Sequence, residues 1–270
     1  MEVNKRFLRK CLLLLYCIGA VLVAKGQILK VDKRSVLEDT SRIWLGNVAF
    51  KLNLNNNNAT AENNLIFVGL HGRTDVNYVS KSHVYTLLNS LNYFTTGAGP
   101  FVSTGYSHFR INWDRKRKLT YENFAQVQYD RGRNLQGRWL AGGGLRLNFY
   151  QTEKSYFHIG VGGMYESETW KRADEMLTTV NIFKSTNYIG AIVDFNQHLT
   201  VNFICYFQTG YYEPFGQWLS RVSGDLNINV KISERLQYST SFRLQYESRP
   251  IIPINRVVYA LTNGINIRFG

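Results

Sequence analysis

The feature that most constrains this chain is a long alternation of apolar and polar residues, clearest at 236–247. The even positions are Leu236, Tyr238, Thr240, Phe242, Leu244 and Tyr246, and the odd positions are Gln237, Ser239, Ser241, Arg243, Gln245 and Glu247. Successive side chains of a β-strand point to opposite faces of the sheet. This segment therefore predicts a long strand with one apolar face and one polar face.

The same alternation recurs in twelve segments, separated by turn residues. They span 42–54, 63–78, 83–94, 102–113, 119–130, 137–150, 156–167, 178–194, 199–212, 218–232, 236–248 and 257–269. The weakest is 178–194, where Lys184 and Asp194 share a parity with Val180 and Ile182. We expect a bulge or a shorter strand to correct the phase there.

The connections between these segments alternate in length. Short polar connections are expected at 79–82, 114–118, 151–155, 195–198 and 233–235, and mostly longer ones at 55–62, 95–101, 131–136, 168–177, 213–217 and 249–256. Short periplasmic turns and longer outer loops are typical of bacterial outer-membrane barrels. An even number of strands then places both termini on the periplasmic side.

A secreted β-sandwich is the rival fold, but its strands would be about 5–6 residues long, roughly half the length expected here. Aromatic residues also cluster near the ends of the segments, as they do at membrane interfaces: Trp44, Tyr78, Phe94, Trp113, Tyr129, Tyr150, Tyr211 and Trp218. A mean hydropathy of −0.23 excludes a polytopic helical membrane protein. The predicted fold is all-β, a transmembrane antiparallel up-and-down β-barrel of about 12 strands over residues 42–270.

The first residues predict a cleavable signal peptide at 1–26. Its basic region holds Lys5, Arg6, Arg9 and Lys10, its apolar run is Leu12–Val23, and Ala24 and Gly26 are the small residues of a cleavage site. An uncleaved anchor is the alternative, and Tyr16 argues against lipid attachment at Cys17. Residues 27–41 are expected to form a short periplasmic tail. Only Cys205 remains after cleavage, which excludes a disulfide or a cysteine metal site within the mature chain.

Charged residues fall on the polar parity of the strands. The predicted lumen-facing basic residues are Arg110, Arg138, Arg146, Arg221, Lys231, Arg243 and Arg268, and the acidic ones are Glu122, Asp130, Asp225 and Glu247. One interpretation is an interior packed with ion pairs, because buried charges are rarely left unpaired. The other is a narrow anion-favouring pore, because rings of Arg and Lys select anions.

The chain's basic balance does not indicate nucleic acid. Removal of residues 1–26 takes away five of the 32 Lys and Arg residues and one of the 19 Asp and Glu residues, which leaves a net charge of +9. Basic balance can mark a nucleic-acid partner, but a secreted chain fits anionic lipopolysaccharide better.

No residue set predicts catalysis, a cofactor or a metal. A strand nucleophile needs its base on the same face, and His71, His108 and His158 have no serine two positions away. An acidic group near one outer loop is expected to be a solvated loop face rather than a cation or protease site: Glu166, Glu168, Asp174 and Glu175. The glycines at 142–144 and 160–163 precede no helix and are expected to let the wall bend.

Several segments together resemble a known family. They are 44–48 (WLGNV), 124–130 (FAQVQYD), 139–146 (WLAGGGLR), 160–166 (GVGGMYE), 246–250 (YESRP) and a final strand ending at Phe269, which Gly270 follows. In these the chain resembles the YdiY-like outer-membrane β-barrels, a family of unknown function of the DUF481 type. The resemblance implies a twelve-stranded barrel and no activity.

The expected location is the outer membrane of a Gram-negative cell. The expected partners are outer-membrane lipid, lipopolysaccharide and the barrel-assembly machinery, which would read the strand ending at Phe269. Three functions stay open: a small porin-like channel whose solute is unknown, a plugged structural or interaction barrel, and, less favoured, an outer-membrane hydrolase.

Overall fold

The computed structural model describes residues 43–55, 67–96, 99–234 and 236–267. The predicted signal peptide at 1–26, the tail at 27–41, Arg268 and Phe269 lie outside the described residues. No helix in the described ranges is long and apolar enough to cross a membrane.

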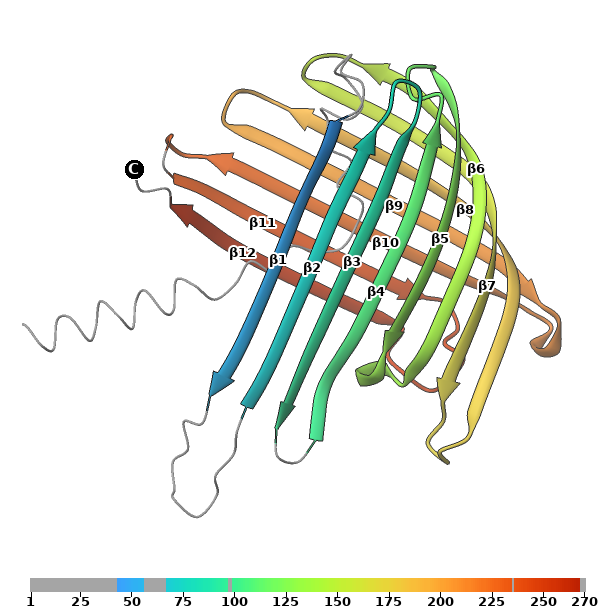
Figure 1. The fold of residues 1–270 in the computed structure, drawn as a ribbon. Helices are drawn as coiled ribbons and strands as arrows, with labels where there is room; N and C mark the ends of the chain where they lie inside the picture. The colour runs from blue at the N-terminus through green and yellow to red at the C-terminus, as the bar shows by residue number, and fades with distance from the viewer. Residues whose placement is uncertain (1–42, 56–66, 97–98, 235, 268–270) are drawn as a thin grey trace, which may run out of the picture.

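Twelve strands form one sheet in which each strand pairs antiparallel with its neighbours in the sequence (Figure 1). Their bounds are β1 (Ile43–Asn55), β2 (Phe67–Val79), β3 (Val84–Thr96), β4 (Gly99–Trp113), β5 (Leu119–Asp130), β6 (Leu135–Gln151), β7 (Ser155–Lys171), β8 (Leu177–Asp194), β9 (Leu199–Tyr212), β10 (Gln217–Lys231), β11 (Leu236–Glu247) and β12 (Val257–Ile267). The predicted up-and-down order and strand number are confirmed.

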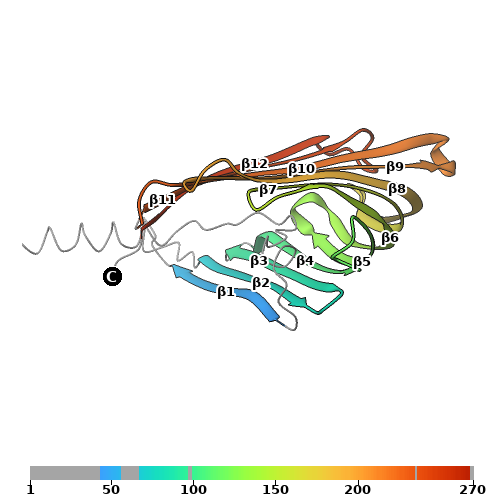
Figure 2. The ribbon, with the colours of Figure 1, turned by 90° about the horizontal axis from the view of Figure 1, so that it is seen from above.

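The sheet curls so that β1–β4 lie on one side and β9–β12 on the other, with β5–β8 forming the bend between them (Figure 2). Among the described residues, β1 and β12 are the two edges of the sheet and no pairing joins them. The concave side of this curled wall is the barrel interior, where the charged parity of the strands lies.

Glycines on the concave face allow the tight bend between β6 and β7. A Cβ atom on Gly144 would lie 2.5 Å from the backbone oxygen of Val161, and one on Gly162 would lie 2.5 Å from that of Gly143. Side chains at these positions would collide with the neighbouring strand. The prediction that this glycine run shapes the wall rather than binding phosphate therefore has a steric basis.

The connections at the two ends differ less than the sequence suggested. At one end, called here the turn end, they are 80–83, 114–118, 152–154, 195–198 and 232–235. At the other, the loop end, they include 131–134, 172–176, 213–216 and 248–256. The expectation of mostly longer connections there is wrong for several of them, because strands such as β7 continue beyond their predicted ends.

Strand β8 keeps its register along its whole pairing with β7 and β9. The bulge expected there is wrong, and register shifts occur instead at Phe94/Thr95, Gln128/Asp130, Leu135/Gly137 and Asn148/Tyr150. The apolar Val180 and Ile182 simply share the inward face with Lys184, where they are buried against Leu219 of β10.

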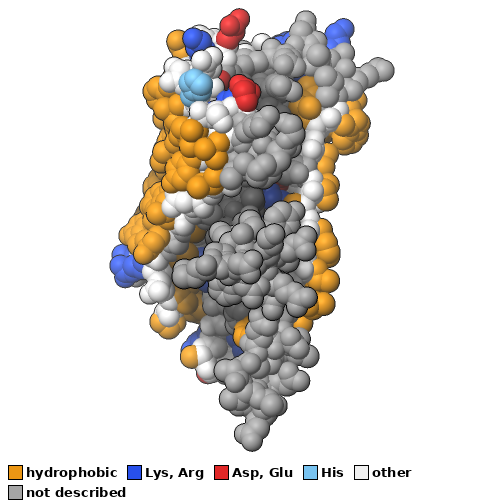
Figure 3. Space-filling model, turned by 90° about the vertical axis from the view of Figure 1, so that its left-hand side faces the viewer, with side chains coloured by type: hydrophobic (Ala, Val, Ile, Leu, Met, Phe, Trp, Pro, Cys, Tyr) orange, Lys and Arg blue, Asp and Glu red, His pale blue; other side chains and the backbone are white. Residues whose placement is uncertain are grey.

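The convex face of the sheet is apolar. Figure 3 shows hydrophobic side chains along both flanks of the molecule, and large exposed ones include Phe50, Val161, Phe183 and Tyr259. Of the aromatic residues predicted near membrane interfaces, Phe94 is the exception, because its ring lies over inward-facing Gly69. The molecule is thus apolar outside and charged inside, the reverse of a soluble domain.

Candidate functional site: the charged interior

Glu166 on β7 is the centre of a buried charge cluster near the loop end. Its side chain has no exposed surface. It forms ion pairs with Arg138 of β6, Lys184 of β8 and Arg221 of β10, the last at 2.9 Å. Three cations from three strands therefore converge on one carboxylate.

Two further carboxylates complete this group. Glu168 accepts from Arg221 at 2.6 Å, lies 3.2 Å from Arg138 Nε, and accepts from the indole N–H of Trp170 at 3.1 Å. Glu247 of β11 lies 3.3 Å from Arg221 Nε. We call this the outer cluster: Arg138, Glu166, Glu168, Lys184, Arg221 and Glu247. Within it three cations meet three carboxylates, and Arg133, outside it, also lies 3.7 Å from Glu247.

The expectation that Glu166 and Glu168 form a solvated loop face is wrong. Both are buried because β7 extends to Lys171 and its even positions face the interior. Asp174 and Glu175, which lie in the connection 172–176, are exposed as expected. Two adjacent parts of one acidic stretch thus have opposite environments.

The connection 248–256 covers the outer cluster. Ile252 is buried against Leu135 and Trp170, with Ile251 and Ile254 packed beside them. The backbone N–H of Ser248 donates to the backbone oxygen of Ser220 at 2.9 Å, which fixes the start of the segment to β10. This apolar cap lies at the loop end of the interior.

A second group, the inner cluster, lies nearer the turn end and consists of Arg110, Glu122 and Arg146. Arg146 Nη2 lies 3.1 Å from Glu122, and Arg110 Nη1 lies 3.6 Å from the same carboxylate. All three side chains are buried. Two guanidinium groups thus share one carboxylate.

Two tyrosines, on β8 and β9, accept hydrogen bonds from these arginines. Arg146 Nε donates to Tyr188 Oη at 2.7 Å, and Arg110 Nη2 donates to Tyr206 Oη at 3.3 Å. Inward-facing Gly160 makes room for the Tyr188 ring, since a Cβ there would lie 2.1 Å from it. The bond from Arg110 to Tyr206 joins β4 to β9 and narrows the interior at this level.

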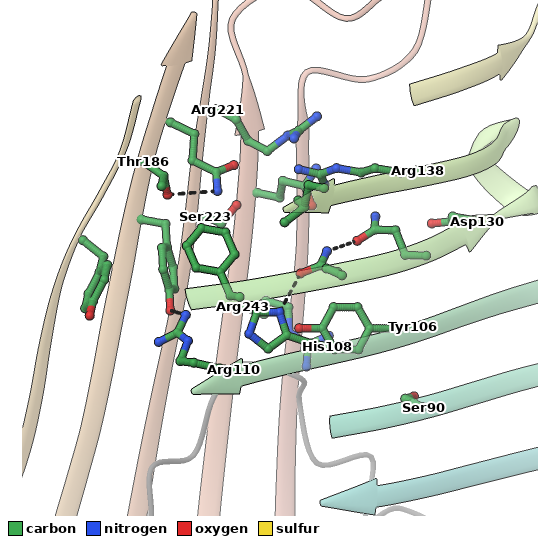
Figure 4. A pocket seen from close by; sticks show the side chains of 18 of the residues that line it. Ser90, Tyr106, His108, Arg110, Asp130, Arg138, Thr186, Arg221, Ser223 and Arg243 are labelled. Carbon is green, nitrogen blue, oxygen red and sulfur yellow. Dashed lines mark hydrogen bonds between the residues drawn. The ribbon is translucent and has the colours of Figure 1, made fainter. Parts of the chain in front are cut away.

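A cavity of about 380 Å³ lies in the interior and is lined by members of both clusters (Figure 4). Its charged lining consists of Arg110, Arg138, Arg221, Arg243, Glu122 and Asp130. Aromatic and amide side chains supply much of the rest, among them Tyr106, Phe124, Tyr188, Gln126 and Gln208. Four arginines and two carboxylates line the cavity, but Arg138 and Arg221 are paired with Glu168, and Arg243 with Asp225, neither of which is in the lining.

The remaining residues of the predicted set lie outside the two clusters. Arg243 Nε is 3.7 Å from the buried carboxylate of Asp225, and Lys231 reaches Glu234 at 2.7 Å at the turn end. Asp130 accepts from the backbone N–H of Arg133 at 3.2 Å and so caps a short 3-10 turn, η1 (Arg131–Arg133). The structure places every described member of the set on the inward parity.

Sequence reasoning missed Glu166, Glu168 and Lys184 as interior charges. Lys184 carried a usable signal, since it shares the parity of Thr186 and Tyr188. The charge pattern alone did not identify that parity as the inward face. Glu166 also carried a usable signal, because it lies on the opposite parity to the apolar Ile159 and Val161.

Neither His108 nor His158 has a serine directly opposite it on a neighbouring strand. His108 lies opposite Leu88 and Gln126, and His158 lies opposite Asn148 and Gly190. In the described part of the chain, no group of three or more His, Cys, Asp and Glu residues is arranged to hold a metal ion.

Comparison with known proteins gives a family and several distant structural likenesses, among them the following two. The structure "NanC porin structure in rhombohedral crystal form" has a TM-score of 0.44 and 9% identity, covering 74% of this chain and 94% of that one. The "TodX monoaromatic hydrocarbon channel deltaS2 mutant" has a TM-score of 0.39 and 9% identity, covering 84% and 80%. At these values neither likeness carries an argument about function, and no curated protein matches.

The family model described as "Protein of unknown function, DUF481" matches residues 50–251. This range includes most of the segments on which the sequence resemblance was based and both charge clusters. The resemblance is therefore confirmed, and the chain belongs to the DUF481 family.

Proposed function

We propose that this protein is a narrow outer-membrane channel for small hydrophilic solutes, with a preference for anions. The observation that carries the proposal is the interior cavity of about 380 Å³ with four arginines and two carboxylates in its lining. Rings of Arg and Lys in a pore attract anions and repel cations. The surplus positive charge there is that of the inner cluster, where Arg110 and Arg146 share one carboxylate, Glu122.

The surface supports the membrane location. In a bilayer core backbone groups must be paired internally, as in helices and closed β-barrels, and in the described sheet β2 to β11 are paired on both sides. The exposed Phe183, Val161 and Tyr259 lie on the convex face, where lipid tails would meet them. In water the same residues would form an apolar surface that monomeric soluble proteins rarely expose.

The interior supports a narrow pore. Arg110 and Tyr206 reach across from β4 and β9, and Arg221 reaches from β10 to the carboxylates of β7. These side chains take up space that a wide general pore would leave to water. The solutes expected to pass are therefore small.

Planar bilayers test this function directly. Refolded protein in a bilayer that separates two potassium chloride concentrations should give discrete currents. Their reversal potential should lie toward the equilibrium potential of chloride. Arg243→Gln should reduce this preference, because Arg243 lines the cavity and its carboxylate partner Asp225 would remain. Lys118→Gln is the matched control, since Lys118 is exposed in the connection 114–118. A cation-selective current would overturn the proposal.

A plugged interaction barrel is the second candidate, and the covering of the outer cluster by 248–256 favours it. The buried Ile252 and the ion-paired Glu166 occupy part of the interior at the loop end. This candidate expects a silent bilayer from protein whose folding is verified by heat-modifiable gel mobility. We do not propose a hydrolase, since His108 and His158 lack a serine opposite them on the neighbouring strands.

A further inference from the structure

The inner cluster holds an uncompensated positive charge. In the described chain, Glu122 is the only carboxylate within ion-pair distance of Arg110 or Arg146. Both arginines are buried, each with 3% exposure. Burying a charge without a counter-charge is costly. The outer cluster differs, because its three cations meet three carboxylates.

Arg110 also has donors that no protein atom accepts. Its Nη2 donates to Tyr206, but its Nε and Nη1 have no hydrogen-bond partner among the described residues. The distance from Nη1 to Glu122, 3.6 Å, is that of an ion pair rather than a hydrogen bond. Arg110 lines the cavity (Figure 4), where its guanidinium also lies 5.8 Å from the ring centroids of Phe124 and Tyr188, while Nε and Nη1 themselves are buried.

His108, two positions from Arg110 on the same face of β4, adds a hydrogen-bond acceptor. Gln126 Nε2 donates to Gln128 at 2.6 Å, so the Gln126 oxygen faces His108 Nδ1 at 3.1 Å and accepts a hydrogen bond from the Nδ1–H group. In the neutral ring Nε2 is then an acceptor. Nε2 is buried and has no hydrogen-bond partner among the described residues, and the His108 side chain lines the cavity.

Aromatic rings flank these two groups. The Tyr106 ring lies parallel to His108 with centroids 6.1 Å apart, and the Phe124 ring lies 6.3 Å away on another side. Both rings line the cavity. They offer an apolar surface to a short carbon skeleton, beside one set of free donors and one free acceptor.

We propose that Arg110 and His108 form a binding site for a small hydroxycarboxylate. The carboxylate accepts from Arg110 Nε and Nη1 and supplies the missing negative charge of the inner cluster. The hydroxyl donates to His108 Nε2, and the carbon skeleton lies against Phe124. The site names a solute class for the proposed channel and to that extent rests on it, but binding itself needs no transport.

Titration calorimetry on the refolded chain in detergent micelles tests the site, with lactate and propionate as probes in chloride-free buffer. Lactate should bind with one site per chain. Propionate, which lacks only the hydroxyl, should bind about tenfold more weakly, the effect of one hydrogen bond. No heat from either probe with folded protein would overturn the proposal.

Variants separate the two halves of the site. Arg110→Gln should abolish binding of both probes, while His108→Phe should reduce lactate to the affinity of propionate and leave propionate unchanged. Lys118→Gln, in an exposed turn, should bind as the wild type does. If Arg110→Gln fails to fold, Arg110→Lys keeps the charge but not the two-donor geometry and should still weaken both probes. Unchanged binding in the folded Arg110 variant would overturn the site.

The outcomes also separate this proposal from the channel. A silent bilayer from protein that binds lactate would contradict the channel and leave the site standing. An anion-selective current from protein that binds neither probe would contradict the site and leave the channel standing. Equal affinity for the two probes would contradict the role given to His108.

Discussion

Glu166 is the residue on which the interior depends most. Its carboxylate forms ion pairs with Arg138, Lys184 and Arg221 at once, and it has no exposed surface. The Arg221 side chain in turn spans three carboxylates, so the loss of Glu166 disturbs the whole outer cluster. Buried ion pairs add little net stability when intact, but removing one partner leaves the other charge buried and unpaired.

Glu166→Gln should therefore destabilise the barrel by roughly 3–5 kcal/mol, the range for breaking a buried pair. Urea unfolding of protein refolded in lipid vesicles measures this as a shift of the transition to lower urea. Glu153→Gln, in the exposed turn 152–154, is the control and should leave the transition in place. Equal transitions for both variants would show that the Glu166 contacts contribute nothing.

The inward position of single residues could be predicted from parity, but their partners could not. Arg110, Arg146 and Glu122 were assigned to the polar face from alternation alone. That Arg110 meets Tyr206, five strands away, depends on how tightly the sheet bends. The bend depends on inward glycines such as Gly144, whose effect is steric and leaves no periodic signal.

At the scale of elements, the alternation predicted which segments are strands better than where they end. β5 and β9 have their predicted bounds, whereas β7 runs four residues beyond 167, to Lys171. The pairing of Lys171 with Leu177 on β8 sustains this extension. Strand ends depend on pairing with a neighbouring strand, and the alternation within a single segment does not record that pairing.

The segment 248–256 is the element whose role the sequence did not indicate. It was expected to be an outer loop, and three of its isoleucines instead pack against interior residues such as Trp170. Ile251 also packs against the cluster that contains Val180 and Ile182, which explains why β8 has these apolar residues on its inward face. An apolar cap from a distant loop therefore accounts for the one strand whose pattern looked out of phase.

Ile252→Asp should release this cap, because a carboxylate placed among Leu135 and Trp170 would be buried without a partner. The expected result is faster tryptic cleavage after Arg256, an exposed residue at the end of the segment. Asn255→Asp adds the same charge at an exposed position of the same segment and should be cleaved at the wild-type rate. If both variants are cleaved alike, the cap does not hold the segment.

At the scale of the whole molecule, the fold class could be predicted from sequence because few folds accommodate an apolar-polar alternation over strands this long. Family membership and the twelve antiparallel strands agree with that prediction. The cavity could not be predicted, since its volume depends on side chains from many strands. Its chemistry could be predicted in outline, as a surplus of arginine on the inward parity.

The central claim is that lipid meets the apolar convex face while the charged face is enclosed, and tryptophan quenching tests it most directly. Trp139 lies half-exposed on the convex face, whereas Trp170 is 1% exposed in the interior. Two single-tryptophan proteins would be made by replacing the other four of the five tryptophans with phenylalanine, and refolded into vesicles of lipids brominated along the acyl chain. The account predicts strong quenching of Trp139 fluorescence and little quenching of Trp170. Equal quenching of the two, or an unquenched Trp139 in folded protein, would contradict it.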